Sequence, residues 1–285
     1  MSEKSRVSQD YFDERIQHAI QGIERCVTYR DDVILGGKTQ QEYEQTLRRV
    51  LDRFKKHGLT CSKTKSEFNL SEITWLGYRL NEHGILPDEK KIQALKATPR
   101  PATKEALNSF ICSCHWNERF VLRFSEQAGA LHDAVHSEEP LEWTDQLNQS
   151  FQEIKDALIE DALNTYFDPK LKTGVFTDAG LTNHTPGKRG GLSAVLAQKH
   201  GQHWLPVVFA SRRMTDVESR YSQCEVESLA ISWALSQKLS YFLVGAPRFT
   251  VYCDCKPVVQ LYNGNRKNIP PRIERHILKV QHLDF

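Results

Sequence analysis

The stretch Thr28-Tyr29-Arg30-Asp31-Asp32-Val33-Ile34-Leu35 carries two adjacent carboxylates between a β-favouring run and an aliphatic run. This pattern predicts a β-hairpin whose tight turn holds Asp31 and Asp32, because Val and Ile favour strands and Asp favours turns. A turn there directs both carboxylates out of the sheet. Paired acids on a rigid hairpin suit a divalent metal, since hard cations prefer oxygen ligands. An ordinary Asp-Asp turn is the alternative that the stretch alone leaves open.

The composition is that of a globular protein and excludes a membrane protein. At 285 residues the chain can form two domains or three small ones, and its 39% apolar and 26% charged residues are ordinary. No apolar run approaches the ~20 residues that span a bilayer, and the N-terminus lacks the apolar core of a secretory signal. The seven cysteines lack a disulfide-scaffold spacing. We therefore expect reduced thiols and an intracellular protein, in the cytoplasm or nucleus, that is not secreted.

The first ninety residues mix helical and extended patterns. Helical spacing of apolar residues predicts helices over residues 8–23 and 39–57 and from Asp88 onward. Strands are expected over residues 59–61 and 73–80. This mixture is typical of an α+β fold.

The middle of the chain is predicted to be helical and the last third α/β. A proline-containing linker at residues 98–102 precedes amphipathic segments with apolar residues at helical spacing. From Phe167 onward the pattern predicts four strands separated by one long helix, with a further helix near the end. The strands are expected over residues 173–178, 191–198, 204–211 and 249–254, and the helices over 217–239 and 272–280.

Three carboxylates occupy these last elements. Asp178 ends the first strand of the segment, Asp254 ends the fourth, and Glu227 lies on the long helix. If those two strands are neighbours, the two aspartates emerge side by side and Glu227 can reach them from across the sheet. Three converging acids repel one another without cations, and two Mg²⁺ ions would hold a phosphodiester and its attacking water in line. Three unrelated acids at element ends are the alternative.

Taken together, these motifs resemble the Pol region of a gypsy-class long-terminal-repeat retrotransposon, truncated at both ends. Residues 29–32 resemble the Tyr-x-Asp-Asp box of a reverse transcriptase palm, and Trp75-Leu76-Gly77-Tyr78 resembles its primer-grip region. The three acid-bearing motifs of a ribonuclease H domain are matched in order by Phe176-Thr177-Asp178-Ala179, by residues 221–230 around Glu227, and by residues 251–257 around Asp254.

The resemblance implies an architecture of α/β and α+β parts. A partial reverse transcriptase palm would span residues 1–90, and a helical thumb and connection linker would span residues 91–165. An RNase H-like domain with a central mixed sheet, truncated at its C-terminal end, would span residues 166–285.

The resemblance also implies roles for individual residues. Asp31 and Asp32 would bind the Mg²⁺ or Mn²⁺ that positions a deoxynucleotide and a primer end. Asp178, Glu227 and Asp254 would hold the metal for hydrolysis of RNA in an RNA–DNA hybrid. Nucleic-acid contacts would come from Tyr29, Trp75, Leu76, Gly77 and Tyr78. The partners would be an RNA–DNA hybrid, a primer-template and other parts of a Pol polyprotein.

Two departures from the family pattern bear on activity. The fingers and the upstream palm motif, which carries another metal-binding Asp, would lie before Ser8, and the fourth ribonuclease H carboxylate would lie beyond Asp284. We therefore expect an incomplete polymerase site, no primer extension by this chain alone, and weak hydrolysis at most. A non-catalytic nucleic-acid-binding relic is the alternative hypothesis, and a fragment of a longer reading frame is a third.

Other chemistry-bearing residues are assigned to packing. The candidate zinc ligands have a Cys-x-Cys spacing tighter than usual and lie in a helical segment: Cys112, Cys114, His115, His132 and His136. Cys253 and Cys255 flank Asp254, and we expect them to pack, since free Cys behaves as a small hydrophobe. The loop at residues 183–190 is expected to be solvated, with contact to a phosphate backbone as the alternative.

Overall fold

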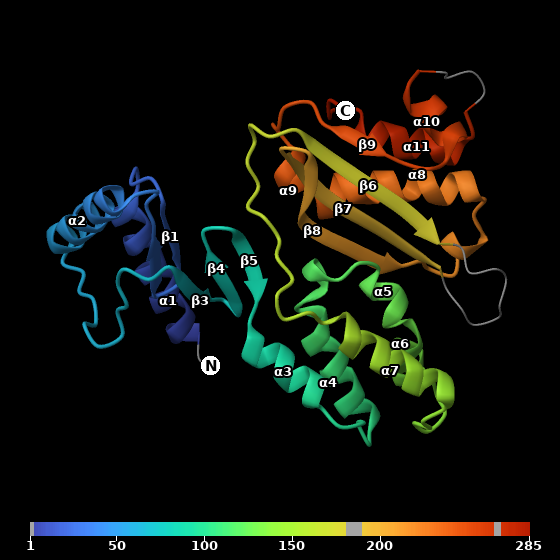
Figure 1. Ribbon diagram of the computed structural model, residues 1–285, viewed down its shortest axis with the longest axis horizontal. Coiled ribbons are helices and arrows are strands. Elements are labelled where there is room, and N and C mark those ends of the chain that lie inside the picture. The colour runs from blue at the N-terminus through green and yellow to red at the C-terminus, as the bar shows by residue number, and fades with distance from the viewer. Residues whose placement is uncertain (1–2, 181–189, 265–268) are drawn as a thin grey trace. The chain divides into compact units, whose positions relative to one another are not determined.

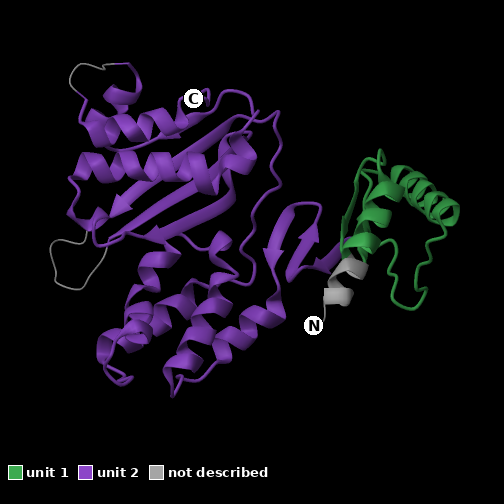
Figure 2. Ribbon diagram, turned by 180° about the vertical axis from the view of Figure 1, so that it is seen from behind, with its two compact units in different colours: residues 1–70 green, residues 71–285 purple. Residues whose placement is uncertain are grey.

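A computed structural model of the chain describes residues 3–180, 190–264 and 269–285 (Figure 1). Contacts group the chain into two compact units, residues 1–70 and residues 71–285 (Figure 2). The domain boundaries after residues 90 and 165 stay a prediction. The loop expected at residues 183–190 lies outside the described residues except for Gly190. Among the described helices, none is long and apolar enough to cross a membrane.

The first unit is a β-hairpin packed with two helices. Its elements are α1 (Glu3–Ile20), β1 (Cys26–Tyr29), β2 (Asp32–Leu35) and α2 (Gln40–His57). The strands are antiparallel with Tyr29 opposite Asp32, so the predicted hairpin is confirmed. Its two-residue turn is Arg30-Asp31, and the prediction that Asp32 also lies in the turn is wrong, because Asp32 pairs as the first residue of β2. The core of the unit is formed by Ile16, Ala19, Ile23, Val50 and Phe54.

The strand predicted over residues 59–61 is wrong. Gly58 takes a left-handed conformation after α2, and the Leu59 N–H donates to the Phe54 carbonyl at 2.9 Å. This backbone bond closes the helix end, and Leu59 packs on the core of the unit beside it. The segment is therefore used to cap α2 and not to pair in a sheet.

The second unit begins with a three-stranded antiparallel sheet of order β3-β4-β5. The strands are β3 (Glu72–Trp75), β4 (Tyr78–Asn81) and β5 (Gly84–Pro87). The single strand predicted over residues 73–80 is wrong, because Leu76 and Gly77 have φ values of 49° and 80° and reverse the chain. Two consecutive positive φ angles are typical of the tight turns that join hairpin strands.

The helical part of the second unit follows. Its helices are α3 (Glu89–Ala97), α4 (Lys104–His115), α5 (Phe124–Gln127), α6 (Gly129–His136) and α7 (Asp145–Ala157). Asp88, Thr103 and Thr144 cap α3, α4 and α7 by accepting hydrogen bonds from backbone N–H groups of the first turn. The helices share one core that includes Leu107, Leu131 and Ile154.

The last part is a mixed four-stranded sheet of order β8-β7-β6-β9, as predicted. Its strands are β6 (Thr173–Gly180), β7 (Gly191–His200), β8 (His203–Arg213) and β9 (Thr250–Tyr252), and only β9 pairs in parallel. Helices α8 (Gln223–Trp233) and α11 (Pro271–Val280) lie side by side along it (Figure 1). Two shorter helices are α9 (Ser240–Leu243) and α10 (Lys256–Tyr262).

The long helix predicted over residues 217–239 is wrong in its bounds. Ser222 and Glu225 form a capping box that starts α8 at Gln223, after a separate 3₁₀ turn at Glu218–Arg220. At the other end α8 passes into a π-helix at Ala234–Lys238. The capping box matters for the site because it sets where Glu227 lies on the helix.

Hydrogen bonds connect the parts of the second unit. Ile85 of β5 and Asn164, which lies between α7 and β6, exchange two backbone hydrogen bonds of 2.8 and 3.0 Å. The Ser125 N–H donates to Ser211 Oγ on β8 at 2.9 Å. The segment around α5 is therefore held against the sheet that carries two of the three predicted acids.

We expect the helical core to contribute strongly to the stability of the second unit. Leu131 is fully buried there, and Leu131→Ala should cost about 2–5 kcal/mol of unfolding free energy, because the cavity adds to the lost transfer energy. Leu122 is 51% exposed, and the same substitution there should cost about 0.5 kcal/mol or less. Urea unfolding of both variants measures the difference. Equal losses would contradict the packing described.

Candidate metal centre

The parallel pairing of β6 with β9 brings two of the predicted acids together. Phe176 lies beside Tyr252 in the register of these strands. Asp178 and Asp254 each follow that pair by two residues, so both lie toward the same end of the two strands. The prediction that Asp178 ends its strand is wrong, because β6 continues to Gly180 in its pairing with β7. The first and fourth strands of this segment are neighbours, which is the condition that the sequence analysis set for the two aspartates to lie side by side.

Glu227 approaches the same edge from α8. Its neighbours Val226 and Ala230 are buried in the core of the sheet, and the Glu227 residue itself is only 1% exposed. The Gln223 side-chain amide donates to Glu227 Oε1 at 2.7 Å. The other oxygen, Oε2, lies 4.0 Å from the Sγ atom of Cys253. Donor atoms of Glu227, Cys253 and Asp254 all lie within 4.8 Å of one another.

The electrostatics of the site oppose an ionised Glu227. Burial and, to a smaller extent, the negative charges of Asp254 and Asp178 raise the pKa of Glu227 to about 7, although the hydrogen bond from Gln223 lowers it. A carboxyl with such a pKa holds a proton about half the time at neutral pH. A divalent cation beside it would favour the ionised form instead.

Asp178 has a different partner. Its half-exposed carboxylate forms an ion pair with the guanidinium of Arg123, which precedes α5. Arg123 has a φ of 54°, a left-handed conformation that few non-glycine residues adopt. The structure therefore brings Glu227 and Asp254 together with Cys253, while Arg123 holds the carboxylate of Asp178.

The donors present fit a divalent cation. The carboxylates of Glu227 and Asp254 lie close together, and that of Asp178 lies on the adjacent strand. One oxygen of the buried Glu227 lies 4.0 Å from the thiol of Cys253. Buried charges in proteins are normally paired or bind a metal. Glu227, Asp254 and Asp178, once released by Arg123, would hold such an ion.

The sequence analysis did not assign three of the side chains at this site to it. Gln223 lies one helical turn before Glu227, a spacing that could have indicated the contact. Cys253 was assigned to packing, although its position next to Asp254 was visible. Arg123 gave no signal, because it lies 55 residues from Asp178 in the chain and meets it only through folding.

The hairpin of the first unit presents the other predicted acids. Asp31 lies in the turn, Asp32 is the first residue of β2, and both are exposed. Tyr29 is 46% exposed, with the Arg30 guanidinium 5.6 Å from its ring centre. The arrangement leaves two carboxylates at the surface of the hairpin tip.

The predicted primer-grip residues form the β3–β4 turn of the second unit. Trp75 pairs with Tyr78 across the strands, and Leu76 in the turn is 39% exposed. The Tyr78 ring stacks on Trp116 at 5.7 Å, and its hydroxyl donates to the Trp116 carbonyl at 2.9 Å. Trp116 is itself 52% exposed, so Leu76 and Trp116 are apolar side chains at the surface of this turn.

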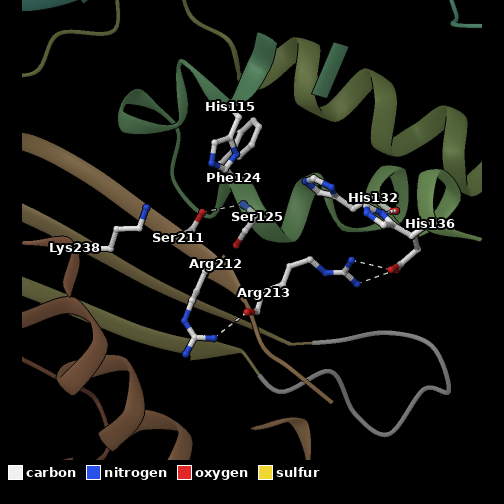
Figure 3. A pocket seen from close by; sticks show the side chains of 10 residues that line it. His115, Phe124, Ser125, His132, His136, Ser211, Arg212, Arg213 and Lys238 are labelled. Carbon is white, nitrogen blue, oxygen red and sulfur yellow. Dashed lines mark hydrogen bonds and ion pairs between the residues drawn. The ribbon is translucent and has the colours of Figure 1, made fainter. Parts of the chain in front are cut away.

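The five candidate zinc ligands lie in different surroundings within the helical part. Cys114 is fully buried in the helical core, and burial raises its pKa to about 12, whereas Cys112 is exposed. His115, His132 and His136 instead line a pocket of about 510 Å³ (Figure 3). The three cations of that pocket each have a carboxylate partner: Arg212 with Glu218, Arg213 with Asp133, and Lys238 with Glu118.

Two known families match parts of the chain. Residues 7–80 match the reverse transcriptase (RNA-dependent DNA polymerase) family, and residues 143–251 match the RNase H-like domain found in reverse transcriptase. The first range contains Asp31 and Asp32, and the second contains Asp178 and Glu227. Asp254 lies just beyond the second range.

The curated relatives are transposon polyproteins. The Retrovirus-related Pol polyprotein from transposon 412 of Drosophila melanogaster is 29% identical over 282 residues, which is 98% of this chain and 22% of that relative. The Transposon Tf2-3 polyprotein of Schizosaccharomyces pombe is 25% identical over 91% of this chain and 19% of its own length. The chain thus spans about a fifth of the length of these relatives.

Solved structures share the fold. A foamy viral protease-reverse transcriptase in complex with dsDNA has a TM-score of 0.80 and 21% identity, covering 98% of this chain and 56% of that one. The same kind of protein in complex with an RNA/DNA hybrid has a TM-score of 0.78 and 19% identity, covering 96% and 36%.

Glu227 should make stability depend on pH in a defined direction. Its pKa is raised in the folded state, so between about pH 4.5 and pH 7 the unfolded chain loses a proton that the folded chain keeps. The unfolding free energy should therefore fall as pH rises through this window, by roughly 3 kcal/mol at most. Glu227→Gln should remove this fall. Chemical unfolding of both proteins in chelator measures it, and a pH-independent difference would contradict the burial of the carboxyl.

Arg123 should compete with a cation for Asp178. Removing it in Arg123→Gln should tighten Mn²⁺ binding about fivefold, because one unit charge at ~4 Å contributes about 1 kcal/mol in water. The half-exposed ion pair itself should add little to stability. Arg272→Gln is a matched control, since that guanidinium pairs with Glu225 outside the site. Calorimetric titration distinguishes them, and equal Mn²⁺ affinities would argue against competition.

Proposed function

We propose a metal-dependent nuclease function for this chain, which belongs to the reverse transcriptase and ribonuclease H family of retrotransposon Pol polyproteins. The substrate is an RNA–DNA hybrid, and the reaction is hydrolysis of the RNA strand with Mg²⁺ or Mn²⁺. The residues that act are Asp178, Glu227 and Asp254.

The buried carboxyl of Glu227 beside Asp254 is the observation that supports this proposal most strongly. A raised pKa and two nearby acids cost the folded chain free energy unless a cation neutralises them. Carboxyl groups with such unfavourable surroundings are commonly found at functional sites. A structural role alone would be served better by an uncharged side chain of similar size.

Each side chain has a part in the proposed reaction. Bound Mg²⁺ would activate a water and neutralise charge on the scissile phosphate. Asp254, at the exposed end of β9, and Asp178 face the solvent side, where a nucleic-acid backbone would arrive. Glu227 supports the ion from the protein interior, and Gln223 orients its carboxylate through the 2.7 Å hydrogen bond. Arg123, which pairs with Asp178, is positioned to pair with a phosphate once that contact opens.

The hairpin of the first unit supports a second part of the proposal. We infer that Asp31 and Asp32 bind divalent cations for RNA-directed DNA synthesis as part of a longer Pol protein, because both carboxylates are exposed at the hairpin tip. Contacts to a primer-template are proposed for Tyr29 and for the β3–β4 turn, Trp75-Leu76-Gly77-Tyr78. Binding of dsDNA and of an RNA/DNA hybrid by the foamy viral proteins supports these partners.

We propose that the protein acts inside the cell, in the cytoplasm or nucleus. All seven cysteines are free in the structure. Free thiols are typical of reducing compartments. Other parts of a Pol polyprotein are proposed as partners, since the relatives that match are several times longer than this chain.

Cleavage of an end-labelled RNA–DNA hybrid tests the nuclease proposal. We expect the RNA strand alone to be cut, only with Mg²⁺ or Mn²⁺, and at least about 100-fold more slowly in Asp178→Asn, Glu227→Gln and Asp254→Asn, because metal stabilisation of the transition state is worth several kcal/mol. Glu274→Gln is the matched control, because it removes an exposed carboxylate on α11.

The result also decides between the proposal and its alternative. Hybrid binding without cleavage under any metal would favour a non-catalytic nucleic-acid-binding relic. Cleavage that persists unchanged in all three site variants would show that the activity comes from another protein in the preparation.

A further inference from the structure

We propose that Cys253 is a metal ligand of this site, so that Cys253, Glu227 and Asp254 together bind a thiophilic divalent cation of the Zn²⁺, Co²⁺ or Cd²⁺ class. The inference rests on the proposed function, because two of its three ligands are the same acids. It adds a soft donor to a site that is otherwise made of oxygen atoms.

The positions of the donor atoms suit one small ion. Cys253 is the first residue after β9, and its Sγ atom lies 4.0 Å from Glu227 Oε2. Sulfur and oxygen ligands of one tetrahedral Zn²⁺ stand about 3.6 Å apart, from bond lengths of ~2.3 and ~2.1 Å. One carboxylate oxygen of Asp254 lies within 4.8 Å of the donor atoms of both Cys253 and Glu227. Shifts of up to about 1 Å in these side chains would bring all three donors onto a common centre.

The burial of Glu227 points independently to a cation. This residue is 1% exposed, and its Oε1 atom already accepts a hydrogen bond from Gln223. Its Oε2 atom faces the thiol, and a thiol is only a weak hydrogen-bond donor. A buried carboxylate oxygen with so weak a partner carries a desolvation cost that a bound cation would remove. Exposed Asp254 leaves the outer side of the site open for a water as the remaining ligand.

The identity of the donors decides which cations are favoured. Thiolate ligands select Zn²⁺ and similar ions, whereas Mg²⁺ requires oxygen ligands in near-octahedral geometry. Binding transfers the thiol proton to solvent as the sulfur–metal bond forms, together with any proton that the carboxyl of Glu227 holds. Because Glu227 and Asp254 are shared, a Zn²⁺-class ion held by Cys253 would exclude Mg²⁺ and inhibit cleavage of the hybrid.

Two further thiols lie close by and must be separated from Cys253 in any test. The Sγ atoms of Cys224 and Cys255 lie 3.7 Å apart and face each other. In the described part of the chain, the group of three potential metal donors contains Cys253 and neither of these two. The geometry therefore assigns the thiol ligand to Cys253.

Absorption spectroscopy with Co²⁺ tests the assignment without any measurement of activity. We expect a near-ultraviolet thiolate-to-cobalt charge-transfer band in the full chain, its loss in Cys253→Ser, and at least about tenfold weaker Co²⁺ binding in that variant. Cys112→Ser, which changes an exposed thiol on α4, should leave the band unchanged, as should Cys224→Ser and Cys255→Ser. Added Zn²⁺ should abolish the band by displacing Co²⁺.

A second measurement uses the unaltered chain, so it does not depend on how the variants fold. The NMR resonance of bound Cd²⁺ lies far downfield when a thiolate is a ligand and upfield when all ligands are oxygen. A downfield resonance is expected. An upfield resonance, a Co²⁺ band retained in Cys253→Ser, or a band lost only in Cys224→Ser or Cys255→Ser would overturn the proposal.

The two proposals fail in different ways. Cleavage with Mg²⁺ and no thiolate signature for Co²⁺ or Cd²⁺ would leave the nuclease proposal intact and refute the role of Cys253. A thiolate signature without cleavage would establish the soft-metal site and count against the nuclease.

Discussion

The burial of one carboxylate beside two others is the constraint on which the site in the second unit depends. The parallel pairing of β6 and β9 sets Asp178 and Asp254 at one edge of the sheet, and α8 brings Glu227 beneath them. Their mutual repulsion and the loss of hydration raise the pKa of Glu227 to about 7. The fold tolerates this cost through a hydrophobic core that includes Val226 and Ala230 on the same helix.

The helical part of the second unit supplies a positive charge beside these carboxylates. Arg123 reaches the sheet from the segment before α5 and pairs with Asp178, and the Ser125 N–H donates to Ser211 on β8. The site therefore contains a cation supplied by the protein itself. Its presence explains why the carboxylate of Asp178 stands apart from the group formed by Glu227, Cys253 and Asp254.

The donors at the site have two different chemical preferences. Carboxylates suit Mg²⁺ and Mn²⁺, which matches the chemistry proposed for hydrolysis of an RNA–DNA hybrid. The thiol of Cys253 suits softer ions, and it lies close enough to Glu227 to share one with it. The choice of ion at such a site would depend on which donors can approach within bonding distance.

Much of the fold and of the candidate site could be predicted from the sequence, because both rest on local patterns. The hairpin around Asp31 and the strands that lead to Asp178 and Asp254 each follow from spacing and residue type within a few positions. The strand expected at residues 59–61 and the uniform helix at 217–239 failed, since a helix cap and a capping box competed for those backbone groups. Tertiary structure alone decided the contact of Arg123 with Asp178 and the approach of Cys253 to Glu227. These pairs are 55 and 26 residues apart, so no local preference of the chain encodes their meeting.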